Sequence, residues 1–374
     1  MLTPFDDYPI HQTALPVAHP GSGDPNHYDR YFFNGYREDL YLGVAMGHYP
    51  NRGVIDAAVS VVHDGVQRSV FASGRMPADP AHTAVGPITL EVVEPLRTTS
   101  VSVDDAGLGI SGEITFEART VAVEEPRQTS YRGSQLMLDS TRLTQWGTWS
   151  GSLDTAAGRI DLDATTTYGT KDRSWGVRPV GQPAPSAPPT ELPQIFFLWN
   201  PVNFPDRCTH FLCFEHADGR RWVESAAEID VLGPDDPTWG DDGAIRHLAG
   251  GGHAITWQPG LRQSMSATVT LHHPDRLEVL SLEPLVTFRM RGIGYLHPEW
   301  AHGTWKGELE TGSEEHAVED LADLAPANIH IQQVVRATSD RGDEGLGVLE
   351  QLAFGAHEPS GLTGFLDGYA PPDQ

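Results

Sequence analysis

Short runs in which apolar and polar residues alternate with a period of two recur along the whole chain. Residues 114–118 read ITFEA, residues 267–271 read ATVTL, and residues 328–332 read NIHIQ. Each run ends near Gly, Pro, Asp or Asn, which is typical of half-buried strands in antiparallel sheets. The sequence shows no strand–helix rhythm of the kind that builds a parallel sheet. It therefore predicts an all-β fold.

The composition agrees with a chain of many turns and few long helices. The 374 residues include 39 glycines and 29 prolines, a high share for a globular protein. Only short helix candidates occur, such as Glu315–Leu324, where apolar residues fall near one face. The length exceeds that of one typical domain and predicts two.

A proline-rich segment marks the expected boundary between the two domains. Residues 179–193 read PVGQPAPSAPPTELP and contain six prolines, which cannot pair in the centre of a sheet. We expect an N-terminal β-domain over residues 1–180, a connector over residues 181–193 and a C-terminal β-domain over residues 194–374.

Two ordered sequence matches suggest that the halves are related. Residues 147–155 read GTWSGSLDT, and residues 303–311 read GTWKGELET. Further along each half, TKDR at residues 170–173 is echoed by TSDR at residues 338–341. Because the order is the same in both halves, we interpret the matches as the internal duplication of a β-unit, with the two GTW tryptophans in equivalent positions.

The chain is strongly acidic, with 51 Asp and Glu against 25 Lys and Arg and a net charge of −26. Such a surface repels the phosphates of nucleic acids and the anionic face of a membrane, so we expect neither as a partner. The N-terminus lacks the basic and apolar regions of a secretory signal, and no apolar run reaches the ~18 residues that span a membrane. We therefore expect a cytoplasmic protein without stable membrane insertion.

The two cysteines, Cys208 and Cys213, are five residues apart. On a strand this odd spacing places them on opposite faces, which makes a disulfide between them unfavourable. Free cysteines agree with the cytoplasmic expectation.

The segment 168–176 reads YGTKDRSWG and is the richest in side chains that carry chemistry. If it is extended, Asp172 shares one face with Tyr168, and Arg173 shares the other face with Trp175. One interpretation is an Asp–Arg turn that closes a strand, with the tryptophan in the core. The other interpretation is a reactive site around Asp172.

Four motifs extend from this segment towards the C-terminus: TTTYGTKDRSWG, FFLWNPVNF, HPEWAHGTWKG and LGVLEQLAFG. Together they resemble the carotenoid 1,2-hydratase and AttH-like families. Members of these families are lipocalin-like proteins with two β-domains, and the wider group includes hydratases of isoprenoid double bonds and some pericyclases. The resemblance therefore implies two lipocalin-like antiparallel β-barrel or sandwich domains that enclose a hydrophobic small molecule.

In the carotenoid hydratases the motif corresponding to DRSWG reads approximately DHNWG, so Asp172, Trp175 and Gly176 match whereas Arg173 and Ser174 depart. The resemblance implies that Asp172 is the acid that protonates a carbon–carbon double bond. Such a carboxyl must be kept protonated by an apolar pocket, whereas a neighbouring cation would hold it ionised. The surroundings of Asp172 therefore distinguish an enzyme from a carrier or a structural role.

Hydration of an unactivated alkene also needs aromatic faces near the cation that forms and a base that holds one water. We expect His297, Glu299 or His302 to position this water. The expected aromatic lining consists of Tyr31, Tyr168, Trp175, Trp199, Trp300 and Trp305. Each of these aromatic residues could instead pack in an ordinary core.

We expect no metal and no other cofactor. The spacing of His297 and His302 fits no common zinc motif, and Pro298 disfavours a helix there. The sequence has no phosphate-binding loop and no dinucleotide fingerprint.

Our first hypothesis is a cofactor-independent hydratase or dehydratase, which is a hydro-lyase. It would act on a C=C bond or a tertiary alcohol of an apolar, terpenoid- or steroid-like substrate. One alternative is a lipocalin-like carrier of a hydrophobic small molecule. Another is a pericyclase or isomerase whose cavity only folds the substrate.

Overall fold

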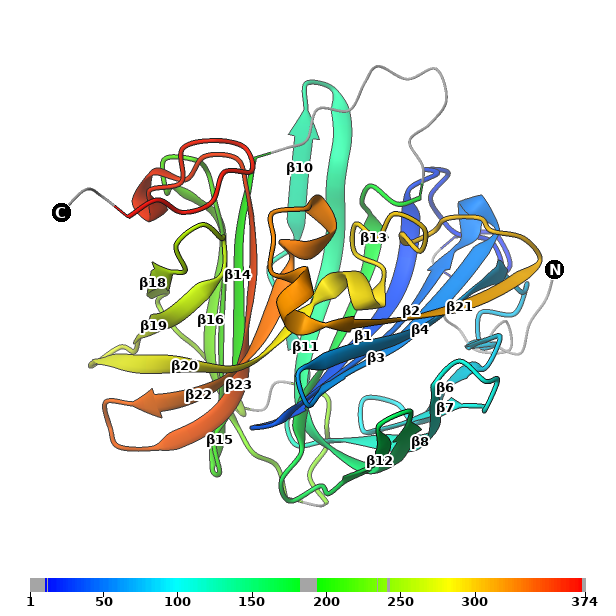
Figure 1. The fold of residues 1–374 in the computed structure, drawn as a ribbon, viewed down its shortest axis with the longest axis horizontal. Helices are drawn as coiled ribbons and strands as arrows, with labels where there is room; N and C mark the ends of the chain where they lie inside the picture. Colours follow the sequence, from blue (N-terminus) through cyan, green and yellow to red (C-terminus); the bar gives the residue numbers. More distant parts are fainter. Residues whose placement is uncertain (1–10, 12, 182–193, 234, 241–242, 372–374) are drawn as a thin grey trace.

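The computed structural model describes residues 11, 13–181, 194–233, 235–240 and 243–371. Nearly all of the regular structure is antiparallel β, and Figure 1 shows two curved sheets packed side by side. The all-β prediction is confirmed. Residues 182–193 of the expected connector lie outside the described residues.

Fourteen strands form sheet A, in the order β21-β4-β3-β2-β1-β13-β11-β8-β7-β6-β5, with β9, β10 and β12 paired to β11. Their bounds are β1 (His27–Arg37), β2 (Leu40–Tyr49), β3 (Val54–His63), β4 (Val66–Arg75), β5 (Ala84–Val85), β6 (Ile88–Glu94), β7 (Thr98–Val103), β8 (Ile110–Ala118), β9 (Val123–Glu124), β10 (Gln128–Arg132), β11 (Gln135–Thr155), β12 (Gly158–Leu162), β13 (Tyr168–Val177) and β21 (Leu309–Ala317).

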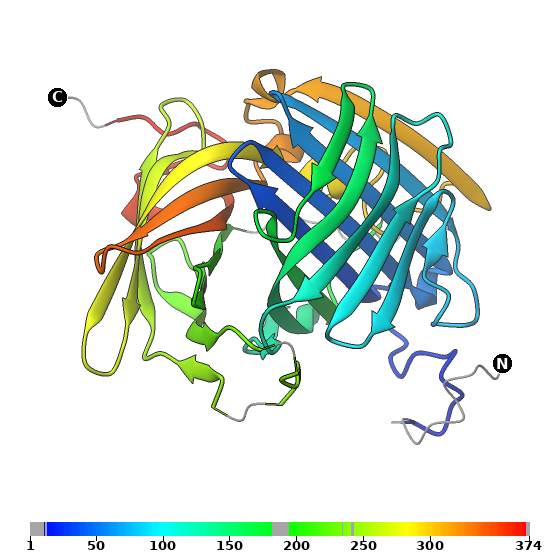
Figure 2. The ribbon, with the colours of Figure 1, turned by 90° about the horizontal axis from the view of Figure 1, so that it is seen from below.

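Nine strands form sheet B, in the order β17-β16-β15-β14-β23-β22-β20-β19-β18. Their bounds are β14 (Ile195–Asn203), β15 (Arg207–Glu215), β16 (Arg221–Asp230), β17 (Ile245–His247), β18 (Gly251–Trp257), β19 (Ser264–His272), β20 (Leu277–Arg289), β22 (Ile331–Ser339) and β23 (Glu344–Phe354). As Figure 2 shows, sheet A curls into a nearly closed barrel and sheet B into a half-barrel.

Short 3₁₀ helices connect some of the strands. They are η2 (Pro50–Arg52), η3 (Met290–Ile293), η4 (Val318–Leu321), η5 (Pro326–Asn328) and η6 (Glu358–Ser360). Among the described residues, no helix has the length and apolar character needed to cross a bilayer.

The alternating runs form strands with one buried face. ITFEA lies in β8, where Ile114 and Phe116 are buried and Glu117 is exposed. ATVTL lies in β19 with its three apolar side chains buried. The third run is only partly a strand, because Asn328 ends η5 and β22 begins at Ile331.

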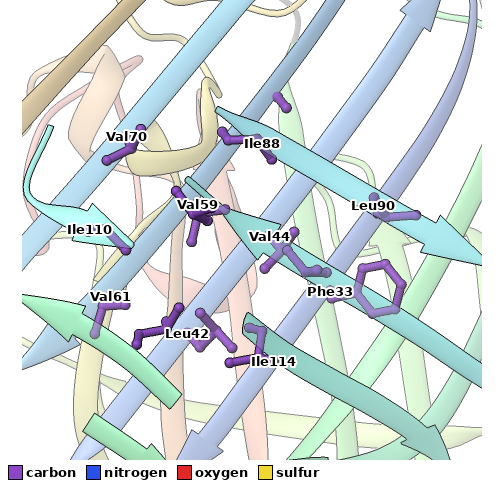
Figure 3. Packing of buried hydrophobic residues seen from close by; sticks show 14 of the residues in the cluster. Phe33, Leu42, Val44, Val59, Val61, Val70, Ile88, Leu90, Ile110 and Ile114 are labelled. Atoms are coloured by element: carbon purple, nitrogen blue, oxygen red, sulfur yellow. The ribbon is translucent and has the colours of Figure 1, made fainter. Parts of the chain in front are cut away.

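The inside of barrel A is filled by aliphatic side chains from strands on all sides. Figure 3 shows Val44, Val59 and Val70 from neighbouring strands facing Ile88 and Ile114 from the opposite side. Trp149 closes this core, and its Nε1 donates a hydrogen bond to the carbonyl oxygen of Asn34 at 2.9 Å. The interior of this barrel is therefore a packed core.

A second apolar cluster lies between the two sheets and joins them into one body. Sheet A contributes Phe32 and Tyr41, and sheet B contributes Trp199 and Phe288. The Tyr41 and Phe288 rings stack with their centroids 4.2 Å apart. Sheet B has its own core on its other face, which contains Cys213, whereas Cys208 lies in a separate cluster facing sheet A. The expectation of two free cysteines on opposite faces is confirmed.

The two GTW segments do not occupy equivalent positions, so this part of the prediction is wrong. Trp149 lies in mid-strand β11 and is fully buried, whereas Trp305 lies in a loop and is 47% exposed. TKDR lies within β13 of sheet A, whereas TSDR ends β22 of sheet B. These placements give no structural support for a duplication.

The helix expected at Glu315–Leu324 is also absent. Residues up to Ala317 belong to β21, and only the 3₁₀ turn η4 follows. β21 pairs with β4 from Leu309↔Gly74 to Ala317↔Val66. The open edge of β4 thus overrides the weak helical pattern, since strand pairing depends on context more than on local propensity.

We predict that Gly169→Ala lowers the free energy of unfolding by about 1 to 3 kcal/mol, the range typical of overpacked cores. A β-carbon at Gly169 would lie 2.5 Å from Nε1 of Trp149 and still closer to the carbonyl oxygen of Asn34. The measurement is urea denaturation, with Gly23→Ala as the control because a β-carbon at Gly23 meets nothing within 4 Å. Equal stabilities of the two variants would contradict this packing.

Candidate active site

Strand β13 presents its side chains alternately to barrel A and to sheet B. Asp172 and Ser174 face sheet B and line a cavity between the sheets. Lys171 and Arg173 face the other way, where Lys171 Nζ lies 6.0 Å from the ring centroid of Phe33 in the barrel core. The expected division of this segment into two faces is confirmed.

The cavity has a volume of about 170 Å³ and is lined by both sheets. Its apolar wall includes Tyr28 and Phe32 from β1, Phe197 from β14 and Phe214 from β15. The charged and polar groups on its wall include Arg142, Asp172, Arg178, Tyr295, His330 and Glu350. The cavity thus combines aromatic faces with titratable groups.

Asp172 is buried in this wall, with 6% of its surface exposed. Its Oδ2 lies 2.5 Å from Nη2 of Arg142, which projects from the neighbouring strand β11. Burial raises the pKa of Asp172 to about 6, because the charges of Glu125 and Glu350 add to the desolvation and together outweigh the attraction of Arg142. This carboxyl therefore holds its proton up to a pH of about 6, well above the range of an ordinary aspartate.

The cation beside Asp172 is Arg142, whereas Arg173 lies on the opposite face of the strand. Arg173 pairs with Asp29 at 2.9 Å and lies over the ring of Tyr31 at 3.7 Å from its centroid. Arg142 in turn pairs with Glu125 at 3.5 Å and lies over the ring of Trp199. Arg173, which departs from the motif of the carotenoid hydratases, therefore does not contact Asp172 directly.

Glu350 is a second carboxyl in the cavity. Its surroundings favour the ionised form, whereas those of Asp172 raise the pKa and favour the protonated form. Its Oε1 lies 2.6 Å from Nε2 of His330, and its Oε2 accepts a hydrogen bond from Gln332 at 2.7 Å. Burial raises the pKa of Glu350, but the contacts with His330, the charge of Arg142 and the Gln332 hydrogen bond together lower it below its usual value. The ionised carboxylate must accept from His330, which leaves His330 Nδ1 buried and without a hydrogen-bond partner among the residues that the structure describes.

Tyr295 lies between two arginines at the same cavity. The Arg30 guanidinium lies 4.6 Å from the ring centroid, and Arg178 Nη1 donates to the phenol oxygen at 3.4 Å. Burial raises the pKa of Tyr295, but the two guanidinium charges outweigh burial and lower it. The edges of His302 and His330 also meet this ring, with centroid distances of 4.7 and 4.6 Å.

Of the three residues expected to hold water, only His302 comes near the cavity. Burial and the charges of nearby arginines keep the pKa of His302 well below its usual value, so it packs against Tyr295 as a neutral ring. His297 Nδ1 accepts backbone hydrogen bonds from Glu299 and Trp300, and its Nε2 contacts Glu314. Glu299 is exposed, and neither His297 nor Glu299 lines the cavity.

The six expected aromatic residues also lie outside the cavity wall. Trp199 is nearest, because it packs beneath Arg142. Tyr168 packs under Arg119 and Trp300 stacks on Phe71, each in the cluster between the sheets. Tyr31, Trp175 and Trp305 lie elsewhere: Tyr31 packs against the core of barrel A, and the two tryptophans are 39% and 47% exposed.

The cavity residues that the sequence did not predict are Arg142, His330, Glu350 and Tyr295. Glu350 carried a local signal, since it is the single charge in the apolar run LGVLEQLAF of β23. A lone charge in a buried strand is rare unless it is paired. Arg142 and His330 lie in polar contexts that give no comparable signal.

Side chains that could hold a metal gather in two groups among the described residues, and both lie in sheet B away from the cavity. One group is Cys213, Glu215 and His253, and the other is Glu228, His273 and Glu278. The cavity itself contains no such group among the residues that the structure describes.

Two solved structures share this architecture. A crystal structure from Nitrosomonas europaea, provisionally described as an AttH, has a TM-score of 0.53 and 14% sequence identity, and covers 90% of this chain and 99% of that chain. The crystal structure of kievitone hydratase from Nectria haematococca has a TM-score of 0.52 and 11% identity, and covers 87% of this chain and 88% of that chain. These matches confirm the lipocalin-like fold with two β-domains.

The sequence comparisons give a family but no activity. No curated protein matches this sequence. A family model described as a family of unknown function, DUF8625, matches residues 2–363. Since this match spans nearly the whole chain, the protein belongs to that family of unknown function.

Proposed function

We propose that this protein is a cofactor-independent hydro-lyase that adds water to, or removes water across, a carbon–carbon double bond in the cavity between the sheets. One observation supports this proposal above all others. The same cavity holds a carboxyl whose pKa is raised, Asp172, and a histidine–carboxylate pair, His330–Glu350, whose carboxylate stays ionised. Two titratable groups whose pKa values are shifted in opposite directions are suited to serve as acid and base.

In the hydration direction, Asp172 gives its proton to one alkene carbon, and the π electron pair forms the new C–H bond. The neighbouring carbon becomes a cation, for which the ring faces of Phe32 and Phe197 provide stabilisation. Arg142, 2.5 Å away, stabilises the Asp172 carboxylate that remains.

Water then forms the C–O bond, and His330 Nδ1 accepts the proton that the water loses. Glu350 holds the ring of His330 through Nε2 and stabilises the imidazolium, which is the role of the carboxylate in a catalytic triad. Return of this proton to Asp172 resets the enzyme. Dehydration of a tertiary alcohol is the reverse of these steps.

The size of the cavity bears on the substrate. Its volume of about 170 Å³ is below the ~300–1,000 Å³ typical of pockets that hold a whole drug-sized ligand. We propose that the reacting end of an apolar, terpenoid- or steroid-like molecule enters, with its oxygen functions facing Arg178 and Tyr295. The solved hydratase of the same fold, kievitone hydratase, agrees with this class of reaction.

The short contact between Arg142 and Asp172 favours a second candidate, a carrier of a hydrophobic small molecule. A carrier needs the apolar wall but no proton donor, and a permanent ion pair would serve it as a fixed polar end. In that case a change at Asp172 would alter affinity and there would be no turnover to lose.

We predict that Asp172→Asn reduces turnover by about 10²- to 10⁴-fold, the usual contribution of a general acid, and leaves ligand affinity nearly unchanged. The substrate is first identified by mass spectrometry of molecules retained from a lipid extract, and turnover and binding are then measured on it. Asp340→Asn is the matched control, because Asp340 is exposed in the similar sequence TSDR. Full activity of Asp172→Asn would remove this residue from the mechanism.

We also predict that the rate of hydration falls as the pH rises through about 6, where the carboxyl of Asp172 loses its proton. In Glu350→Gln the remaining activity should decline at a lower pH, because removing the nearby negative charge lowers the pKa of Asp172. The measurement is the pH profile of kcat/KM for both proteins. If kcat/KM fell at the same pH in Glu350→Gln as in the wild-type protein, the result would contradict the coupling of the two carboxyls.

A further inference from the structure

We propose that sheet B contains a binding site for one transition-metal ion of the zinc type, formed by Cys213, Glu215, His253 and His357. The site is separate from the cavity, and the inference does not depend on the proposed hydro-lyase activity. Cys213 and Glu215 come from β15, and His253 comes from the edge strand β18. His357 precedes η6 in the segment after β23.

The ligand atoms of three of these residues already converge, and His357 joins them through its contact with Glu215. One atom each from Cys213, Glu215 and His253 lies within 4.8 Å of the others. The two oxygens of Glu215 lie 2.9 Å from Nε2 of His253 and 3.0 Å from Nε2 of His357. Tetrahedral zinc with bonds of about 2.0 to 2.3 Å needs its ligands roughly 3.3 to 3.8 Å apart, so small side-chain shifts would complete the site.

The surroundings orient these ligands and exclude water. Cys213, Glu215 and His357 are almost fully buried, and the side chain of His253 is 10% exposed. His357 stacks on Phe196 with centroids 3.6 Å apart, and its Nδ1 lies 2.8 Å from the hydroxyl of Ser360. A partner on the second nitrogen is the usual way in which a metal-binding histidine is held in place.

The ligand atoms of the Cys213 cluster are of the types that bind transition metals. The other cluster in sheet B, formed by Glu228, His273 and Glu278, differs from it in charge balance and in ligand type. There, Glu278 contacts three arginines, Arg207 at 2.8 Å, Arg276 at 3.3 Å and Arg341 at 3.6 Å, so its charge is already balanced. That cluster also lacks a thiol.

In the Cys213 cluster the single arginine, Arg221, divides its contacts among Glu215, Glu224 and a backbone oxygen. A thiolate with two imidazoles and one carboxylate selects zinc-like ions over magnesium or calcium.

Such an ion would have a structural role. β15 and β18 are far apart in the strand order of sheet B, so no backbone ladder joins them. Four protein ligands leave no open position on a tetrahedral ion, which is the mark of a structural site. The ion would tie the edge of the half-barrel to β15, the strand whose Phe214 lines the cavity on the other face.

The test is titration of the full-length protein, freed of metal by a chelator, with cobalt as a spectroscopic substitute for zinc. We expect one cobalt per chain, a thiolate-to-cobalt charge-transfer band and the visible bands of four-coordinate cobalt. Zinc should displace the cobalt and raise the midpoint of thermal unfolding.

Cys213→Ser should abolish the charge-transfer band, and His253→Gln or His357→Gln should weaken cobalt binding at least tenfold. Cys208→Ser is the matched control, since Cys208 is buried on the opposite face of the same strand and should keep the band. His273→Gln, in the arginine-rich cluster, should also bind cobalt normally.

Absence of stoichiometric cobalt binding by the folded wild-type protein would overturn the proposal, and so would a band that survives Cys213→Ser. If Cys213→Ser does not fold, the two histidine variants decide the matter, and unchanged affinity in both would refute the site. These outcomes leave the proposed hydro-lyase activity untouched, since none of these residues lines the cavity.

Discussion

The buried guanidinium of Arg142 lies where the two sheets meet, and the polar part of their contact is arranged around its charge. It projects from β11 of sheet A, lies over Trp199 of sheet B and contacts both Glu125 and Asp172. A charge in this position is tolerated only where carboxylates balance it. Glu125 extends the network to His210 of sheet B at 3.3 Å. The ion pairs of Arg142 therefore lie within sheet A, on the face that meets sheet B, and Arg142 and Asp172 also form part of the polar wall of the cavity.

Competition among three carboxyls for one arginine explains why Asp172 is the carboxyl whose pKa is raised. Glu125 has further donors in Thr144 and His210, and Glu350 has His330 and Gln332. For Asp172 the structure gives Arg142 as its side-chain partner, and the other two negative charges act against its ionisation. The raised pKa of Asp172 follows from an unequal supply of hydrogen-bond donors among the three carboxyls.

The fold could be predicted from the sequence because period-two patterns and turn residues are local signals, as β8 and β19 show. Asp172 could be found because its strand carries a motif. The rest of the candidate site could not, since Arg142 of sheet A and Glu350 of sheet B come together only where the two sheets pack, and His330 reaches Glu350 from the residue just before β22, the hairpin partner of β23. In the HPEWAH segment His297 accepts backbone hydrogen bonds from its own loop, and a sequence pattern cannot distinguish such a contact from a catalytic role.

The return of β21 to the edge of β4 has a consequence for the order in which the protein is made. Sheet A lacks its last strand until residue 317 has left the ribosome, by which time most of sheet B has been synthesised. During that interval β4 presents an unpaired edge, the feature of a nascent sheet most prone to join a neighbouring chain. The long separation between the paired strands also slows closure of the barrel. Sheet A can therefore be completed only after most of the second half of the chain has been made.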